Sequence, residues 1–198
     1  MPAGLTQLAV VNEALQFVAA QTTVTSLTDP QQPAGIYAAV VYAPTVQLML
    51  RELDPDFARY TATLTLSGAA TPVAPWAYEY LYPADCVRLR QVAPPANGYD
   101  PLDPQPIRAN VSFDIISAVN TKVILTNQVN ALAVYTSSTV TEVQWDSSFT
   151  DAVVRRLANP LAMALSGRPD FAREILEESA KMASSAYGVD EGMLVPTR

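Results

Sequence analysis

The sequence predicts an α+β protein, because the spacing of its apolar residues changes twice along the 198 residues. The spacing is helical up to about residue 59, alternates from Thr61 onward, and is helical again from Phe149. We expect the terminal helices to pack as one bundle. We expect the middle segment to form a small antiparallel β-sandwich or barrel, inserted between the second helix and the C-terminal helices. The predicted parts are residues 1–59, 60–146 and 147–188, followed by a tail at 189–198.

The N-terminal part predicts two helices. Thr6 is the expected N-cap of the first helix. The apolar face of that helix is spaced by three and four residues and comprises Leu8, Val11, Leu15 and Val18. The second helix covers residues 34–53, and Pro44 is expected to kink or break it. The apolar residues that line up along it, and just beyond its end, are Ile36, Val40, Ala43, Val46, Leu50, Leu53 and Phe57.

The middle part predicts five to seven short strands, most of them antiparallel. Two segments alternate clearly, with Ala62, Leu64 and Leu66 on one face of the first and Val111, Phe113 and Ile115 on one face of the second. The segments 121–126 and 131–136, joined by "NQVN", predict a β-hairpin. The stretch "TVTEVQW" is either a last strand or a connector, and residues 93–106 predict a long irregular loop.

The C-terminal part predicts two more helices. Ser147 or Ser148 is the expected cap of the first, and Asp151 is expected in the first turn, where its charge complements the helix dipole. Pro160 is expected to kink this helix. Its apolar residues step by four and comprise Phe149, Val153, Leu157, Leu161 and Leu165. A last helix is expected after "SGRPD", followed by the tail "VDEGMLVPTR".

The composition argues against several classes of function. The net charge is −7 and no basic run is present, so tight sequence-specific binding of nucleic acid is not expected, although DNA can pass by without sticking. Histidine is absent, which excludes Ser-His-Asp and Cys-His catalysis and the commonest zinc sites. We expect neither a cofactor nor a metal. No run of 18 apolar residues is present, so we expect a soluble protein with no membrane partner, made in a cytoplasm.

Charged residues make up only 16% of the chain, below the roughly 25% typical of globular domains. A surface poor in charge indicates that much of it faces other protein.

A row of aromatic residues raises the question of a binding platform. Trp76, Tyr78, Tyr80 and Tyr82 fall on every second residue, so a strand would place all four rings on one face. Such rows stack sugars or bases in some proteins. Base stacking normally comes with cations on the same face, and here Arg88 and Arg90 lie on a separate segment after "PAD". The pattern therefore favours a row buried in the fold or in an interface.

The remaining candidates for chemistry are a cysteine and scattered carboxylates. Cys86, beside Asp85, lacks a histidine base, so we expect it to be a small buried residue at the start of a strand. Two carboxylates at the right separation are enough for a hydrolase, but no spacing singles out a pair. The carboxylates considered are Glu79, Asp85, Asp114, Glu142 and Asp146.

Five blocks of sequence, in order, resemble a known family. They are "VVNEALQFV…TVTSLTD", "YAPTVQLMLRELDPDFARYTATLTL", "WAYEYLYPADCVRLRQV", "VILTNQVNALAVYT" and "FTDAVVRRLANPLAMALSGRPDFAREIL". Together they resemble the tail tubular protein A family of tailed phages, the head-to-tail connector or adaptor proteins of short-tailed phages. The resemblance covers about residues 8 to 190, and its most specific blocks are "YEYLYPADCVRLR" and "ILTNQVNALAVYT".

The resemblance implies a structural virion protein and no enzyme. Members of the family are expected to form a twelve-fold ring beneath the portal, to present a platform to the tail nozzle protein and to surround the channel through which DNA leaves. The C-terminal segment of the family often reaches the portal. This implies a portal-binding role for Met193, Leu194, Val195 and Pro196.

Arg88 and Arg90 are candidates for a subunit interface. Two other functions stay open from the residues alone: a peptidoglycan hydrolase that uses a carboxylate pair, and a carbohydrate-binding β module.

Overall fold

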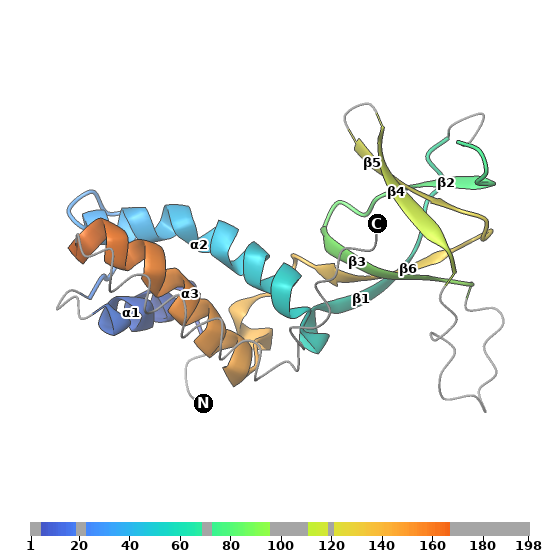
Figure 1. Cartoon of the computed structure of the whole chain (residues 1–198). Coiled ribbons are helices and arrows are strands. Elements are labelled where there is room, and N and C mark those ends of the chain that lie inside the picture. Colours follow the sequence, from blue (N-terminus) through green and yellow to red (C-terminus); the bar gives the residue numbers. More distant parts are fainter. Residues whose placement is uncertain (1–4, 19–22, 69–72, 96–110, 119–120, 167–198) are drawn as a thin grey trace. The chain divides into compact units, whose positions relative to one another are not determined.

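The computed structural model describes residues 5–18, 23–68, 73–95, 111–118 and 121–166. Within these residues it contains three α-helices and two three-stranded antiparallel sheets, which confirms the predicted α+β class (Figure 1). The chain divides into two compact units. A helical unit combines the residues up to Phe57 with those from Val140 onward, and a β unit comprises Ala58–Thr139. The predicted last helix, the tail and most of the loop at 93–106 lie outside the described residues.

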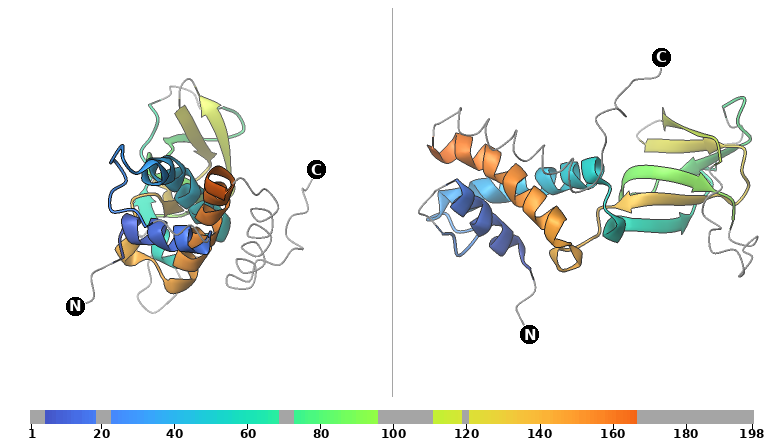
Figure 2. Two further views of the ribbon diagram at one scale, coloured as in Figure 1. Left: turned by 90° about the vertical axis from the view of Figure 1, so that its left-hand side faces the viewer. Right: turned by 60° about the horizontal axis from the view of Figure 1, so that its bottom comes forward.

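In the helical unit, α3 (Ser147–Ser166) packs against both α1 (Gln7–Phe17) and α2 (Pro33–Leu53), as Figures 1 and 2 show. Thr6 caps α1 as predicted, because its Oγ1 accepts a hydrogen bond of 3.2 Å from the Ala9 N–H. Short 3₁₀ turns at Asp56–Ala58 (η1) and Glu142–Gln144 (η4) follow α2 and precede α3. "TVTEVQW" is therefore a connector. The fully buried large side chains of this unit include Leu15, Leu50, Phe149, Leu157 and Leu161.

The helix α2 runs without a break through Pro44, so of the predicted kink or break the break does not occur. Its inward face also differs from the predicted one. Small residues such as Gly35 and Ala38 are buried, whereas Ile36 and Val40 are 40% and 67% exposed. A Cβ on Gly35 would overlap the Ser26 carbonyl oxygen, so the preceding loop lies too close for a larger residue. The tight approach reverses the expected orientation of the N-terminal half of α2, while Leu50 and Leu53 are buried as predicted.

The start of α3 corrects two predictions. Asp146, not a serine, caps the helix, since its Oδ1 accepts a hydrogen bond of 2.7 Å from the Phe149 N–H. Asp151 lies beyond the first turn and forms an ion pair of 2.9 Å with Arg155, one turn further on. The predicted apolar face is buried except for Leu165, and the helix is continuous through Pro160.

One side chain ties the loop after α1 back to that helix. The amide of Asn12 donates to the Val24 carbonyl oxygen at 2.9 Å and accepts from the Val24 N–H at 2.8 Å. Val24 is almost fully buried, so its backbone groups have little access to water. Asn12 therefore satisfies both buried backbone groups of one loop residue.

The β unit contains two sheets. Sheet A has the order β1 (Arg59–Thr63), β6 (Leu132–Ser137), β3 (Cys86–Ala93), and sheet B has the order β2 (Tyr78–Leu81), β5 (Thr121–Thr126), β4 (Phe113–Ala118). The predicted hairpin between 121–126 and 131–136 is wrong, because β5 and β6 belong to different sheets. Each is the central strand of its own sheet, with neighbours on both sides, so neither has a free edge for the other.

The two sheets share one core. Its buried members come from both sheets and are Leu64, Tyr80, Val92, Ile124, Ala131, Ala133 and Tyr135. Backbone contacts also join the sheets, through the Leu66–Tyr80 bridge and through the Val111 N–H, which donates to the Val92 carbonyl at 2.9 Å. Leu66 and Ile115 depart from their predicted inward faces, with exposures of 58% and 39%.

Candidate interaction surfaces

The predicted portal-binding residues Met193, Leu194, Val195 and Pro196 lie outside the described residues. Their role stays a prediction. The other candidate residues all lie within the described residues.

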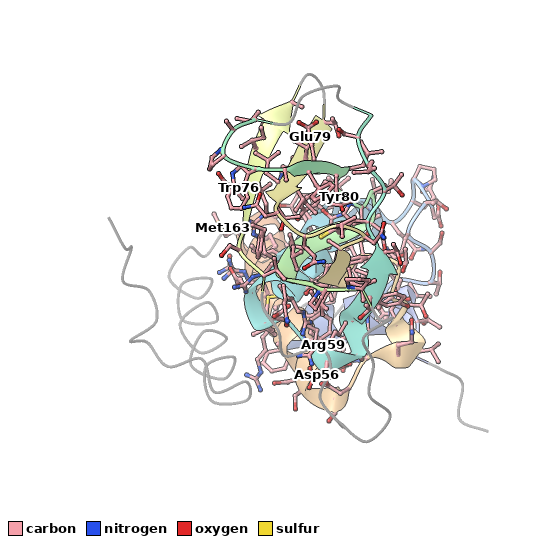
Figure 3. All side chains as sticks on the ribbon, turned by 90° about the vertical axis from the view of Figure 1, so that its right-hand side faces the viewer. Asp56, Arg59, Trp76, Glu79, Tyr80 and Met163 are labelled. Carbon is pink, nitrogen blue, oxygen red and sulfur yellow. The ribbon has the colours of Figure 1, made fainter. Side chains whose placement is uncertain are left out.

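Most of the aromatic row lies in the core of the β unit. Tyr80 is 2% exposed, and its hydroxyl donates to the Gln128 carbonyl oxygen at 2.9 Å. Tyr78 and Tyr82 pack against the core, with the Tyr78 ring 6.2 Å from that of Tyr80. Trp76 precedes the strand and is half-buried. Figure 3 shows Tyr80 on the inner side of β2 and Glu79 on the outer side. These tyrosines therefore form packing and not an open platform.

Cys86 begins β3 as predicted, but it is half-buried and not fully buried. Burial raises the pKa of its thiol, which disfavours the reactive thiolate. The neighbouring Asp85 accepts a hydrogen bond from the Ser137 hydroxyl at 2.6 Å and from the Tyr135 hydroxyl at 3.1 Å. These contacts hold the start of β3 against the end of β6.

Four of the five candidate carboxylates accept hydrogen bonds in the structure, and one of them is Asp114, which accepts from the Ile115 N–H at 2.8 Å. Asp85 joins β3 to β6, Glu142 accepts a hydrogen bond of 2.8 Å from the Tyr42 hydroxyl, and Asp146 caps α3. Glu79 and Asp114 share the outer side of sheet B, where both stand opposite Leu125. Within the described residues, no group of three or more Cys, Asp or Glu side chains is arranged to hold a metal ion.

Arg88 and Arg90 lie on the outer side of sheet A, and the structure adds Arg59 to them. Arg59 on β1 and Arg88 on β3 both stand directly opposite Thr136 of β6, and Arg90 Nε donates to Thr136 Oγ1 at 3.0 Å. Register shifts in β3, between Cys86 and Arg88 and between Leu89 and Gln91, accompany the approach of both Arg88 and Arg90 to the same threonine. The sequence does not reveal this grouping, because Arg59 and Arg88 are 29 residues apart and their strands meet only through β6.

The outward face of α2 is an apolar surface that the sequence did not predict. Large residues along this face are 36–67% exposed, and they comprise Ile36, Tyr37, Val40 and Leu48; the exposed Ala43 and Pro44 lie between them. Among the described residues, α2 alone has the length and apolar composition of a membrane-spanning helix, a property it shares with core helices of soluble proteins. Successive turns of α2 therefore expose apolar side chains on this face.

No family model and no curated protein matches this chain.

Proposed function

We propose that this chain is a structural protein of a phage particle, a head-to-tail adaptor that acts through protein contacts and carries no catalytic step. The observation that carries the proposal is the outward face of α2. Ile36, Val40 and Leu48 would gain by burial against another protein, since apolar area removed from water contributes about 25 cal/mol per Å². Contiguous apolar faces of this kind mark protein–protein contacts.

The partners in this proposal are those of the family that the five sequence blocks resemble. The adaptor docks beneath the portal, forms a ring of twelve copies, offers a platform to the nozzle protein and surrounds the exit path of the DNA. The acidic balance of the chain supports a wall that does not retain DNA. The protein is assembled in the host cytoplasm and resides in the neck of the virion.

The test combines the purified chain with the portal protein of the same phage and images the mixture by negative stain. Rings attached to the portal are expected for the wild type. Val40→Asp, which places a charge on the α2 face, is expected to abolish attachment while the far-UV circular dichroism spectrum is unchanged.

Val143→Asp is the matched control, because Val143 belongs to the same unit, is 72% exposed and lies in η4 and not on the outward face of α2. Attachment should survive this change. A wild-type chain that stays monomeric beside the portal contradicts the adaptor function. Equal attachment by the two variants contradicts the role of the α2 face.

A further inference from the structure

Three of the four outer strands of the β unit have edges that other groups of the chain already occupy. In sheet B, the outer edge of β2 bonds to the segment that follows β1. The Ser67 N–H donates to the Glu79 carbonyl at 2.9 Å, and the Leu81 N–H donates to the Thr65 carbonyl at 2.8 Å. A strand from another molecule therefore cannot add at β2 without displacing this segment.

The edges of β4 and β3 are also protected. On β4, the Ile115 N–H donates to the carboxylate of the neighbouring Asp114 at 2.8 Å, so this N–H is occupied without a further strand. On β3, the Val92 carbonyl accepts from the Val111 N–H at 2.9 Å, and two register shifts make the strand irregular. A side chain on an edge group and an irregular strand both discourage pairing with another chain.

The edge of β1 differs, because its outward backbone groups have no partner among the described residues. β1 is an outer strand of sheet A, as the right-hand view of Figure 2 shows. The Leu64 N–H donates to the Ala131 carbonyl on the β6 side of the chain. Hydrogen-bonded pairs alternate along an antiparallel ladder, so Ala62 bonds to β6 while Thr61 and Thr63 turn their N–H and C=O groups the other way. Both threonines are exposed, and none of the described residues bonds to these groups.

The sequence of this edge adds no protection. From Tyr60 to Leu66 the chain contains no charged residue, proline or glycine. The register of β1 with β6 is unbroken from Arg59 to Thr63, so the edge is regular. Natural proteins usually blunt an exposed edge with lysine, proline or a bulge, and a regular, uncharged edge favours pairing with another strand.

A second copy of β1 complements this edge. When two β1 strands run antiparallel with Thr61 of each opposite Thr63 of the other, every outward N–H of these threonines meets an outward carbonyl. Ala62 lies at the two-fold axis of this arrangement. Tyr60, which is 37% exposed, stands opposite Leu64 of the second copy and gains apolar contact. Threonine pairs across strands are favourable, and no charged residue stands opposite another in this register.

We infer that two copies of this chain join through the edges of their β1 strands, so that their A sheets form one continuous antiparallel sheet across a two-fold axis. The occupant of the edge is thus a second copy of the same chain. A two-fold contact closes on itself and does not extend into a ring. The inference therefore concerns the free chain and goes beyond the proposed function.

Two substitutions at one residue test the backbone contact. Thr61→Pro removes the edge N–H, and proline is tolerated on an edge strand whose N–H faces solvent. Each copy loses one intermolecular hydrogen bond, so dimerisation should weaken by roughly tenfold or more. Thr61→Val keeps the N–H and a β-branched side chain, so it is the matched control and should dimerise like the wild type. Sedimentation velocity over a range of protein concentrations measures all three proteins.

A second pair of variants uses charge. Thr61→Lys/Thr63→Lys places lysines directly opposite each other in the paired strands, so this variant should be monomeric at low ionic strength and dimerise in part at high salt. Ser117→Lys/Ala118→Lys adds the same charge at exposed positions of β4 and should dimerise like the wild type. Circular dichroism checks the fold of every variant.

A wild type that is monomeric at every concentration overturns the inference. So does a dimer that forms equally well in folded Thr61→Pro and Thr61→Lys/Thr63→Lys. Val40→Asp separates this contact from the outward face of α2, because it leaves β1 unchanged and should dimerise like the wild type. Loss of the dimer in Val40→Asp, with the dimer kept in Thr61→Pro, would assign the contact to α2 and overturn the role of β1.

Discussion

A tyrosine hydroxyl donates to a distant carboxylate in each unit, but the two carboxylates are bonded differently. In the helical unit, Tyr42 donates to Glu142 at 2.8 Å, and this is the one hydrogen bond described for that carboxylate. In the β unit, Asp85 accepts from Tyr135 at 3.1 and 3.2 Å and from Ser137 at 2.6 Å. Asp85 stands at the end of a strand ladder, where the Ser138 N–H also donates to its backbone carbonyl at 2.8 Å.

The difference shows how each unit is held together. The β unit has a backbone ladder, and Asp85 closes one end of it. The helical unit has no ladder between its helices, so the segments between helices depend on single side chains that reach buried backbone groups. Asn12, which satisfies both backbone groups of Val24, is the clearest case. Loss of a single polar side chain should therefore lower stability more in the helical unit, wherever that side chain is the sole hydrogen-bond partner of a buried backbone group.

The largest expected effect is that of Asn12→Ala. The change leaves the buried N–H and C=O of Val24 without their partner, at a cost of about 3–4 kcal/mol for the two groups. The free energy of unfolding, measured by urea titration with circular dichroism at the helical band, should fall by this amount. Asn12→Asp keeps the acceptor for the Val24 N–H but loses the donor for its C=O, so a smaller loss is expected. Equal stability of the wild type and Asn12→Ala would contradict the sole-partner argument.

The sequence predicted where the helices and strands lie, because periodicity reports the local backbone directly. The inward face of α2 was not predictable in this way. Apolar residues lie almost all round the helix, and the close approach of the Ser26 carbonyl to Gly35 decides which side is inside. The pairing of β5 and β6 escaped prediction for a similar reason. Their alternation and the short "NQVN" link suit a hairpin equally well, and only the other four strands separate them.

Some features of the candidate surfaces could likewise be predicted from the sequence, and others could not. The burial of the tyrosine row followed from its neighbours Ala77, Glu79 and Leu81 and from the lack of nearby cations. The meeting of Arg59 with Arg88 at Thr136 depends on strand order and on register shifts in β3, and neither leaves a signal in one sequence. The portal-binding role of Met193–Pro196 stays a prediction, as do the adaptor function, its partners and its location in the virion.

The second prediction compares the two carboxylates. Asp85→Ala removes the acceptor of two buried hydroxyl groups and should lower the free energy of unfolding by about 2–3 kcal/mol. Glu142→Ala removes the acceptor of one, so about 1–2 kcal/mol is expected. Tryptophan fluorescence and circular dichroism during urea unfolding measure both losses. A larger loss for Glu142→Ala would reverse the ranking of the two sites.

The third prediction concerns the two tyrosines at high pH. Burial, together with the hydrogen bond to Asp85, raises the pKa of Tyr135 to about 12 from 10.0, and burial next to Glu142 raises the pKa of Tyr42 further. The folded state thus holds protons that the unfolded state has released. The stability from these neutral hydroxyls is complete below pH 10.0 and is lost as pH rises through the folded-state pKa of about 12.

The urea midpoint of the wild type should therefore fall as pH rises above about 10. Tyr135→Phe removes one titrating group and should make the fall less steep. Tyr42→Phe should do the same through the helical unit. Unchanged steepness in both variants would show that other groups cause the alkaline loss.

The smallest expected effect separates two helix caps within the helical unit. Thr6 accepts from Ala9 N–H at 3.2 Å on the exposed start of α1, whereas Asp146 accepts from Phe149 N–H at 2.7 Å beside a fully buried ring. Thr6→Ala should cost about 0.5–1 kcal/mol, and Thr6→Ser, which keeps the hydroxyl, should cost less. Asp146→Ala should cost more than Thr6→Ala, because a carboxylate at the N-terminus also interacts favourably with the helix dipole. Equal losses at the two caps, measured by urea unfolding, would mean that neither the shorter bond nor the charge strengthens the cap of α3.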